Sequence, residues 1–216
     1  MKPVRAVVFD FDGVIVDSEP CWDRADARLV QAEGRALLPG AKKAVIGLKQ
    51  EVSIRKILAM HGIDGDPVVF MRRREKMMEE YYGAEIPLMP GAAAALAALH
   101  GQGLPLAVAS STPWRLVELA LVRHGVRKFF AHVVTAEEVA HGKPAPDVFL
   151  RAFELLGVSP GEAIVVEDSL PGIIGAVASG ALAVWLINEH QPEARAKAAR
   201  AIASLADLPA LAASLP

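Results

Sequence analysis

The N-terminal stretch VRAVVFDFDGVIVDSEP, residues 4–20, constrains the fold more than any other part of the chain. Residues 4–9 are almost all apolar and show no alternation with polar residues, which is typical of a strand that helices cover on both faces of a parallel sheet. Asp10 and Asp12 follow where this strand should end, and Asp17 comes shortly after. The stretch therefore predicts that carboxylates project from the end of a buried strand.

Four further runs share this apolar pattern, at residues 104–109, 132–135, 163–166 and 183–187. The segments between them carry helix signals, because residues 91–100, 113–124 and 144–156 are each followed by a glycine, and the second begins at a proline. Alternating strands and helices predict an α/β fold with an open, Rossmann-like, doubly wound parallel sheet.

Residues 18–84 interrupt this order, because they carry no strand signal and are too long for a single crossover helix. Apolar and aromatic residues there recur at the spacing of one helix face, together with one arginine: Phe70, Arg74, Met77 and Tyr81. We expect residues 18–84 to form an α-helical cap domain inserted into an α/β core of residues 1–17 and 85–216. The Ala-rich residues 192–216 are expected to form a helix followed by a surface tail.

Composition and charge narrow the class of protein. An apolar fraction of 53% with 22% charged residues is typical of a globular chain, and a formal net charge of -2 disfavours a nucleic-acid partner. The single cysteine, Cys21, excludes an internal disulfide and fits a reducing compartment. Because no stretch is apolar enough for a membrane span and the strand pattern begins near the N-terminus, we expect a cytoplasmic monomer without a membrane partner.

Polar residues gather after the strands, at what should be one edge of the sheet. They are Asp10 and Asp12 after the first strand, Ser110 and Ser111 after the second, Lys143 after the third, and Glu167 and Asp168 after the fourth. Each cluster alone is commonly a helix cap or a turn, but four clusters share the edge where open α/β folds bind ligands. Converging carboxylates require a cation, and oxygen ligands without histidine or cysteine favour magnesium. A lysine and hydroxyls beside such an ion suit a phosphate group.

Four segments carry a resemblance to a known family, namely DFDGVIVDSEP, VASST, GKPAPDVF and VVEDSLPGI, in this order. They resemble the four motifs of haloacid dehalogenase-superfamily phosphatases, and the resemblance covers essentially the whole chain, including the cap. Within the superfamily, DSEPCWDRA and the size of the cap resemble the β-phosphoglucomutase-like and sugar-phosphate phosphatase branch. The resemblance is strongest to the phosphatases of this branch that act on hexitol phosphates and 2-deoxyglucose 6-phosphate.

The resemblance implies catalytic and metal-binding roles. Asp10 would be the nucleophile that forms an aspartyl-phosphate, and Asp12 the general acid and then the general base. Mg²⁺ would be held by a carboxylate oxygen of Asp10, the backbone carbonyl of Asp12 and Asp168, with Glu167 as a ligand or a neighbour of the ligands. The activity implied is hydrolysis of a small phosphorylated metabolite.

The resemblance also implies a set of phosphate contacts. Ser110 would contact a phosphoryl oxygen with help from Ser111, and Lys143 would neutralise the transferring group. Backbone amides of Phe11, Asp12 and Gly13 would complete the cradle. Substrate identity is expected to depend on the cap turn at residues 47–51, which includes Lys49 and Gln50, although Lys49 is equally compatible with a solvated surface position.

Three alternatives remain open at this point. β-Phosphoglucomutase-like members carry histidine at the position of Trp22 and arginine at that of Gln50, so the sequence favours hydrolysis over a phosphomutase reaction. A phosphoacceptor signalling receiver would be shorter and would lack an inserted cap. A catalytically inactive binding module would have lost a motif residue, and none is missing from this sequence.

Overall fold

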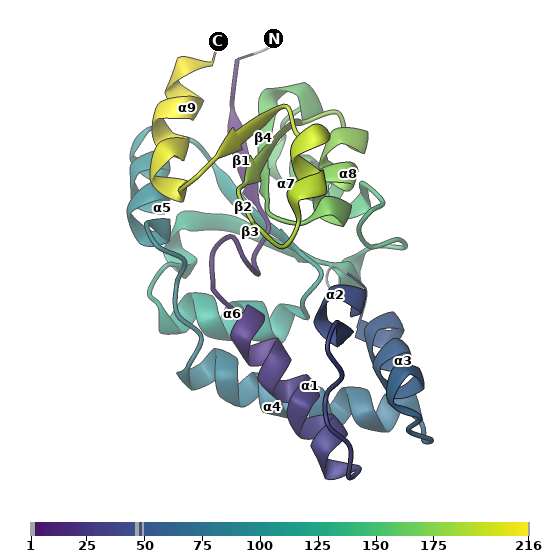
Figure 1. Ribbon diagram of the computed structural model, residues 1–216. Helices are drawn as coiled ribbons and strands as arrows, with labels where there is room; N and C mark the ends of the chain where they lie inside the picture. The colour runs from purple at the N-terminus through teal and green to yellow at the C-terminus, as the bar shows by residue number, and fades with distance from the viewer. Residues whose placement is uncertain (1–2, 46–47, 49, 216) are drawn as a thin grey trace.

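A parallel β-sheet forms the centre of the computed structural model, which describes residues 3–45, 48 and 50–215 (Figure 1). Within these residues the sheet has six strands in the order β3-β2-β1-β4-β5-β6. The strands are β1 (Ala6–Phe9), β2 (Leu106–Ser110), β3 (Phe130–Thr135), β4 (Ala163–Glu167), β5 (Leu182–Leu186) and β6 (Arg200–Ile202). Because β1 lies between β2 and β4, its carboxyl end is at the middle of the sheet, and this end carries Asp10.

Helices cover both faces of the sheet. One face packs against α5 (Ala92–Gly101), α6 (Trp114–Arg123) and α9 (Leu208–Ser214), and the other against α7 (Asp147–Leu156) and α8 (Leu170–Ala178). Successive residues of β1 point to opposite faces, so that Val7 and Phe9 enter the first of these cores and Val8 the second. Because both faces of the sheet are covered, the sequence of β1 is a continuous apolar run. The layers confirm the predicted α/β fold with a doubly wound parallel sheet.

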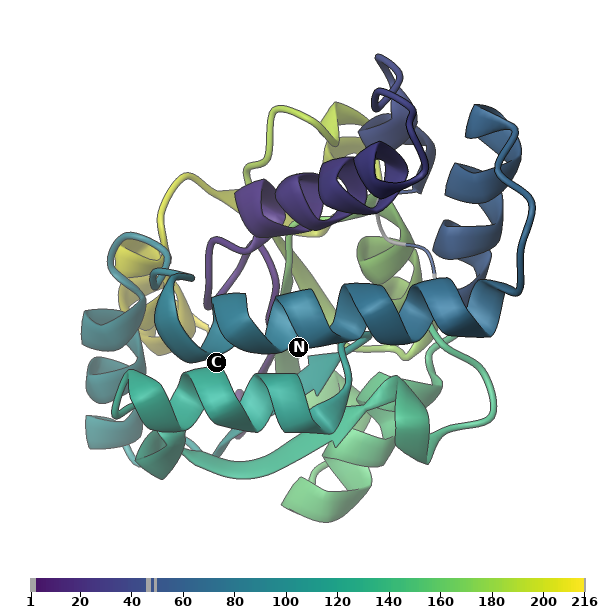
Figure 2. The same cartoon turned by 90° about the horizontal axis from the view of Figure 1, so that it is seen from below.

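The helical segment after β1 stands apart from the sheet as a cap, on the side where the strands end (Figures 1 and 2). It contains α1 (Glu19–Ala32), α2 (Ala41–Val45), α3 (Gln50–His61) and α4 (Pro67–Ala84). Leu29, Ile54, Leu58 and Phe70 form a small core between these helices. Helix α4 also lies along α6 of the core. The limits that we place on the cap, residues 18 and 84, stay a prediction.

The C-terminal segment corrects one expectation from the sequence. In place of a helix followed by a tail, residues 192–215 contain two 3₁₀ turns, the edge strand β6 and the short helix α9. Strand β6 has only three residues and is half-exposed, so it leaves no apolar run, and it is specified by backbone pairing with β5. In the described part of the chain, 3₁₀ turns lie at Arg127–Phe129, Ala136–Glu138, Pro160–Glu162, Pro192–Ala196 and Leu205–Asp207.

Within residues 3–45, 48 and 50–215, no helix is both long and apolar enough to cross a bilayer. Helix α4 has the greatest length, 18 residues, but carries several charged side chains along it.

Burial on the sheet predicts which leucines stabilise the fold. Leu96 of α5 is fully buried against the sheet, whereas Leu150 of α7 is 42% exposed. Leu96→Ala should lower the free energy of unfolding by about 2–5 kcal/mol because it leaves a cavity. Leu150→Ala is the matched control and should change it by about 0.5 kcal/mol or less. Urea denaturation followed by circular dichroism measures both, and equal losses would contradict this account of the core.

Candidate active site

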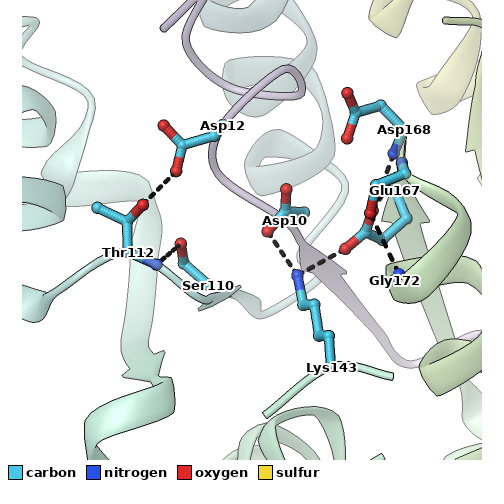
Figure 3. Close-up of polar contacts among 9 residues, drawn as sticks. Asp10, Asp12, Ser110, Thr112, Lys143, Glu167, Asp168 and Gly172 are labelled. Carbon is cyan, nitrogen blue, oxygen red and sulfur yellow. Dashed lines mark hydrogen bonds and ion pairs between the residues drawn. The ribbon is translucent and has the colours of Figure 1, made fainter. Parts of the chain in front are cut away.

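Asp10 and Lys143 meet at the end of the central strand (Figure 3). Lys143 precedes α7 and joins Pro144 through a cis peptide bond. Its Nζ donates hydrogen bonds to Oδ1 of Asp10 and to Oε1 of Glu167, each at 2.5 Å. All three side chains are buried. Burial alone would lower the pKa of Lys143, but the two carboxylates outweigh this effect and hold that pKa above its ordinary value, so the lysine stays charged.

Glu167 links this ion pair to the start of α8. Its Oε2 accepts hydrogen bonds from the backbone amides of Asp168 and Ser169, both at 3.0 Å, and from the Ser169 hydroxyl at 2.9 Å. The side chain lies directly against Gly172, where an added Cβ would stand 1.8 Å from Oε1. The glycine therefore makes room for a carboxylate at the N-terminus of a helix, where the helix dipole favours negative charge.

Asp168 lies close to both Asp10 and Glu167, and its orientation is fixed by groups around it. Asn188 donates a hydrogen bond to its Oδ2 at 2.8 Å, and the Trp185 indole donates to its backbone carbonyl at 3.1 Å. Gly13 passes so close that an added Cβ would stand 2.2 Å from Oδ2, and its φ of 77° is one that side-chain-bearing residues rarely adopt. Only glycine fits this turn without moving Asp168.

The carboxylates of Asp10, Glu167 and Asp168 suit a metal ion. One oxygen from each lies within 4.8 Å of the others. Burial, followed by the charge of Glu167, raises the pKa of Asp10 to about 7. Burial and the charges of Glu167 and Asp10 raise the pKa of Asp168 well above its ordinary value. Lys143 balances only one of three negative charges, so this oxygen-only set fits a hard divalent cation.

Asp12 points away from Asp10, toward the loop after β2 (Figure 3). Its carboxylate accepts hydrogen bonds from three hydroxyls, those of Ser18, Tyr82 and Thr112, and the Thr112 bond measures 2.6 Å. Ser18 precedes α1 and Tyr82 lies near the end of α4, so both segments that join the cap to the core contribute a donor. The side chain of Asp12 is thereby oriented from three directions.

The structure also places the predicted phosphate contacts. Ser110 is buried, and its hydroxyl accepts a hydrogen bond from the Thr112 amide at 3.0 Å, while Ser111 lines the pocket above Asp10. The Phe11 side chain packs into the core against the Tyr82 ring. The Gly13 amide donates to the Val16 carbonyl at 2.8 Å, so in this structure it closes the turn and does not face the pocket.

A pocket between the sheet edge and the cap contains the candidate residues of both. Asp10, Asp12, Lys143, Glu167 and Asp168 line its floor. Its cap side is lined by Trp22, Asp26, Gln50, Ser53 and Arg74, among others. Gln50 therefore lines the pocket, whereas Lys49 lies outside the described residues.

Arg74 is buried on the cap side of the pocket, although it belongs to a run of basic residues, 72–74, that suggests a solvated face. It is only 5% exposed, stacks 4.7 Å from the centre of the Trp22 ring, and lies 3.0 Å from Asp26. Burial lowers the pKa of Arg74, and burial raises the pKa of Asp26 to about 6. Arg73, one position earlier, does pair at the surface, with Glu33 at 2.7 Å.

Several residues that line the pocket or contact Asp12 were not singled out from the sequence. Tyr82 follows Tyr81 in a helix of ordinary composition, and Asp26 lies in a helix with other charges, so neither has a local signal. Arg74 did have a local sequence signal, because it falls on the same helix face as Phe70 and Tyr81, and that face is buried. A charged residue on an apolar face is a reason to expect a buried ion pair.

Comparisons with known proteins agree with this geometry. The family model of the haloacid dehalogenase-like hydrolases matches residues 4–180. Hexitol phosphatase A of Escherichia coli strain K12 is 35% identical over 82% of this chain and 80% of its own length.

Solved structures are similar over nearly the whole chain. CbbY from Rhodobacter sphaeroides in complex with phosphate has a TM-score of 0.84 and 27% identity, covering 95% of this chain and 96% of its own. A putative β-phosphoglucomutase from Thermotoga maritima has a TM-score of 0.77 and 25% identity, covering 96% and 98%. With its parallel sheet, its cap and a family match over most of its length, this chain belongs to the haloacid dehalogenase-like hydrolases.

Proposed function

We propose that the protein is a Mg²⁺-dependent phosphatase that hydrolyses small sugar or polyol phosphate monoesters through an aspartyl-phosphate intermediate. The observation that carries this proposal is the position of Asp10, which stands at the end of β1 in contact with Lys143 and beside two further carboxylates. The similarity to hexitol phosphatase A supports a phosphorylated polyol or sugar as substrate.

Asp10 is the nucleophile in this proposal. One of its oxygens attacks phosphorus, a new bond forms between that oxygen and phosphorus, and the bond from phosphorus to the substrate oxygen breaks. Strand β1 is hydrogen-bonded to a neighbour on both sides, so the backbone that carries the nucleophile is rigid. Lys143 contacts Asp10 directly and supplies a fixed positive charge beside the phosphoryl oxygens.

Asp12 moves the protons. It donates one to the departing alkoxide, and as a carboxylate it then takes one from the water that attacks the aspartyl-phosphate. The hydroxyls of Ser18, Tyr82 and Thr112 hold its carboxylate away from Asp10 in this structure. Because two of these donors come from the segments that join the cap to the core, the orientation of Asp12 depends on where the cap sits.

Magnesium would be held by a carboxylate oxygen of Asp10, the backbone carbonyl of Asp12 and Asp168. When bound, it withdraws negative charge from the transferring phosphoryl group. Glu167 belongs to the cluster but already accepts from Lys143 and from two backbone amides, so it suits the role of a neighbour that orients the others. Ser110, Ser111 and the amides of Phe11 and Asp12 would contact the phosphoryl oxygens.

A phosphomutase reaction is the alternative, and the similarity to a putative β-phosphoglucomutase supports it. The residue at position 22 argues against a mutase. Trp22 packs against Arg74, and its side chain has no group that could transfer a proton as a histidine would. Cytoplasmic location, a monomeric state and a role for Lys49 in substrate binding stay predictions from the sequence.

Incubation with phosphate esters tests the reaction type. The purified protein should release inorganic phosphate from a panel of hexose, pentose and polyol monophosphates when Mg²⁺ is present, and should not do so in EDTA. Interconversion of positional isomers without release of phosphate would establish the mutase alternative. A lack of turnover across the whole panel would contradict both reactions.

The two aspartates should respond differently to amide substitution. Asp10→Asn should lower kcat by about 10³-fold or more on every ester, because the amide is a poor nucleophile. Asp12→Asn should lower kcat/KM by about 10²–10⁴-fold on alkyl phosphates and much less on aryl phosphates, whose leaving groups need little protonation. Steady-state kinetics on both ester types measure this, with the exposed Asp64→Asn as control. Equal losses on the two ester types would contradict the acid role of Asp12.

Removal of one carboxylate should separate metal binding from stability. The raised pKa of Asp168 means that its ionised form disfavours folding at pH 8, well above the ordinary pKa of an aspartate. Asp168→Asn should therefore raise Tm in EDTA by about 2–4 °C or more, whereas Mg²⁺ should raise Tm of the wild type only. Differential scanning fluorimetry measures both effects. An Asp168→Asn variant that Mg²⁺ stabilises as much as the wild type would show that Asp168 is not a ligand.

A further inference from the structure

Three buried side-chain polar atoms lack a hydrogen-bond partner in the part of the chain that the structure describes. They are Nε2 of Gln50, Nε of Arg74 and Oδ1 of Asp26. Burying such groups without a partner loses the hydrogen bonds that water would make to them, so native proteins rarely keep them without a reason. All three belong to residues that line the cap side of the active-site pocket.

The pairing of Arg74 with Asp26 is incomplete in a specific way. Nε of the arginine lies 3.0 Å from Oδ1 of the aspartate, yet neither atom makes a hydrogen bond, because the N–H is not directed at that oxygen. The rest of the guanidinium is held in place by the Ser53 hydroxyl, 3.1 Å from Nη1, and by the Trp22 ring. The charges compensate each other while one donor and one acceptor stay available side by side.

A hydroxyl group matches this arrangement. It can accept a hydrogen bond from Nε of Arg74 and donate one to Oδ1 of Asp26, while a carboxylate or a phosphate oxygen can only accept. The Gln50 amide supplies a further donor for a neighbouring hydroxyl. All three atoms are covered from bulk water, so a hydroxyl that reaches them through a small side-chain adjustment meets no competing water.

A second anionic group on the substrate finds no such match among the cap-side residues that the structure describes. Arg74 already faces the carboxylate of Asp26, and Lys42 lies 3.1 Å from carboxylate oxygens of both Glu19 and Asp23. Each of these cations on the cap side of the pocket is thus compensated, and a distal phosphate or carboxylate would also approach their acidic partners.

We propose that Asp26, Arg74 and Gln50 form a hydroxyl-recognition site that selects a neutral, polyhydroxylated leaving group and disfavours substrates with a second anionic group. The inference rests on the proposed phosphatase function. It adds the chemical class of the leaving group and the residues that recognise this group. Asp26, Arg74 and Gln50 determine specificity in this proposal. The bond-breaking steps are carried out by Asp10 and Asp12 on the floor of the pocket.

Three matched substrates test the site in the wild-type protein. A hexitol 6-phosphate, n-hexyl phosphate and a hexitol 1,6-bisphosphate share a six-carbon chain and differ in hydroxyls or in charge. We expect kcat/KM for the hexitol monophosphate to exceed that for n-hexyl phosphate by about 10²-fold or more, because an analogue without hydroxyls leaves buried polar groups unpaired. The bisphosphate should be poorer than the monophosphate by about tenfold or more.

Two variants assign the preference to the site. Asp26→Leu with Arg74→Met replaces both charges at once, which avoids leaving one of them buried and alone. Gln50→Met removes only the amide. Each should lower the ratio of kcat/KM for the hexitol monophosphate over n-hexyl phosphate by about tenfold or more. Arg73→Gln is the matched control, because Arg73 pairs with Glu33 outside the pocket, and it should leave the ratio unchanged. Thermal unfolding of each variant establishes that it is folded.

The outcomes separate this inference from the proposed function. A wild-type protein that hydrolyses n-hexyl phosphate as well as the hexitol ester is a phosphatase without hydroxyl recognition, which overturns the inference alone. A preference for the bisphosphate overturns it as well, because Arg74 would then bind an anion. Folded variants that keep the wild-type ratio also overturn the inference, because other residues would then recognise the hydroxyls. A protein that hydrolyses none of the three esters, nor an aryl phosphate, overturns the proposed function itself.

Discussion

Repulsion among buried carboxylates at the end of the central strand is the constraint on which the rest of this structure depends. Asp10, Glu167 and Asp168 come together in a place shielded from water, and Lys143 balances only part of their charge. Such a cluster persists only because the surrounding fold holds it. The sheet fixes Asp10, the N-terminus of α8 holds Glu167, and Asn188 and Trp185 hold Asp168. Gly13 and Gly172 leave the room that these side chains need.

The cap takes part in the site through Asp12 as well as through the pocket wall. Ser18 and Tyr82, from the two segments that connect cap and core, both donate hydrogen bonds to this carboxylate. A movement of the cap would therefore alter the partners of Asp12 at the same time as it changes access to the pocket. Leaving-group recognition and proton transfer would then be coupled through a few contacts, which is how enzymes commonly link closure over a substrate to chemistry.

Much of the fold was predictable because it depends on local patterns. Continuous apolar runs marked five strands, and glycines marked the ends of helices. Strand β6 was missed because a short edge strand needs little apolar character. The floor of the pocket was predictable for a similar reason, since its residues follow strand ends. The cap side was not, because Asp26 and Arg74 lie on different helices and their contact depends on how α1 and α4 pack. Tyr82 likewise meets Asp12 only in three dimensions, 70 positions away in the sequence.

The central claim is that Asp10 becomes phosphorylated during the reaction. Acid quenching during the first turnover of a sugar or polyol phosphate with Mg²⁺, followed by peptide mass spectrometry, tests it most directly, because acid slows the hydrolysis of an acyl phosphate. We predict a phosphoryl group on the peptide that contains Asp10, absent from the Asp10→Asn variant. A protein that releases phosphate with no covalent intermediate, or with the phosphoryl group on another residue, would contradict this account.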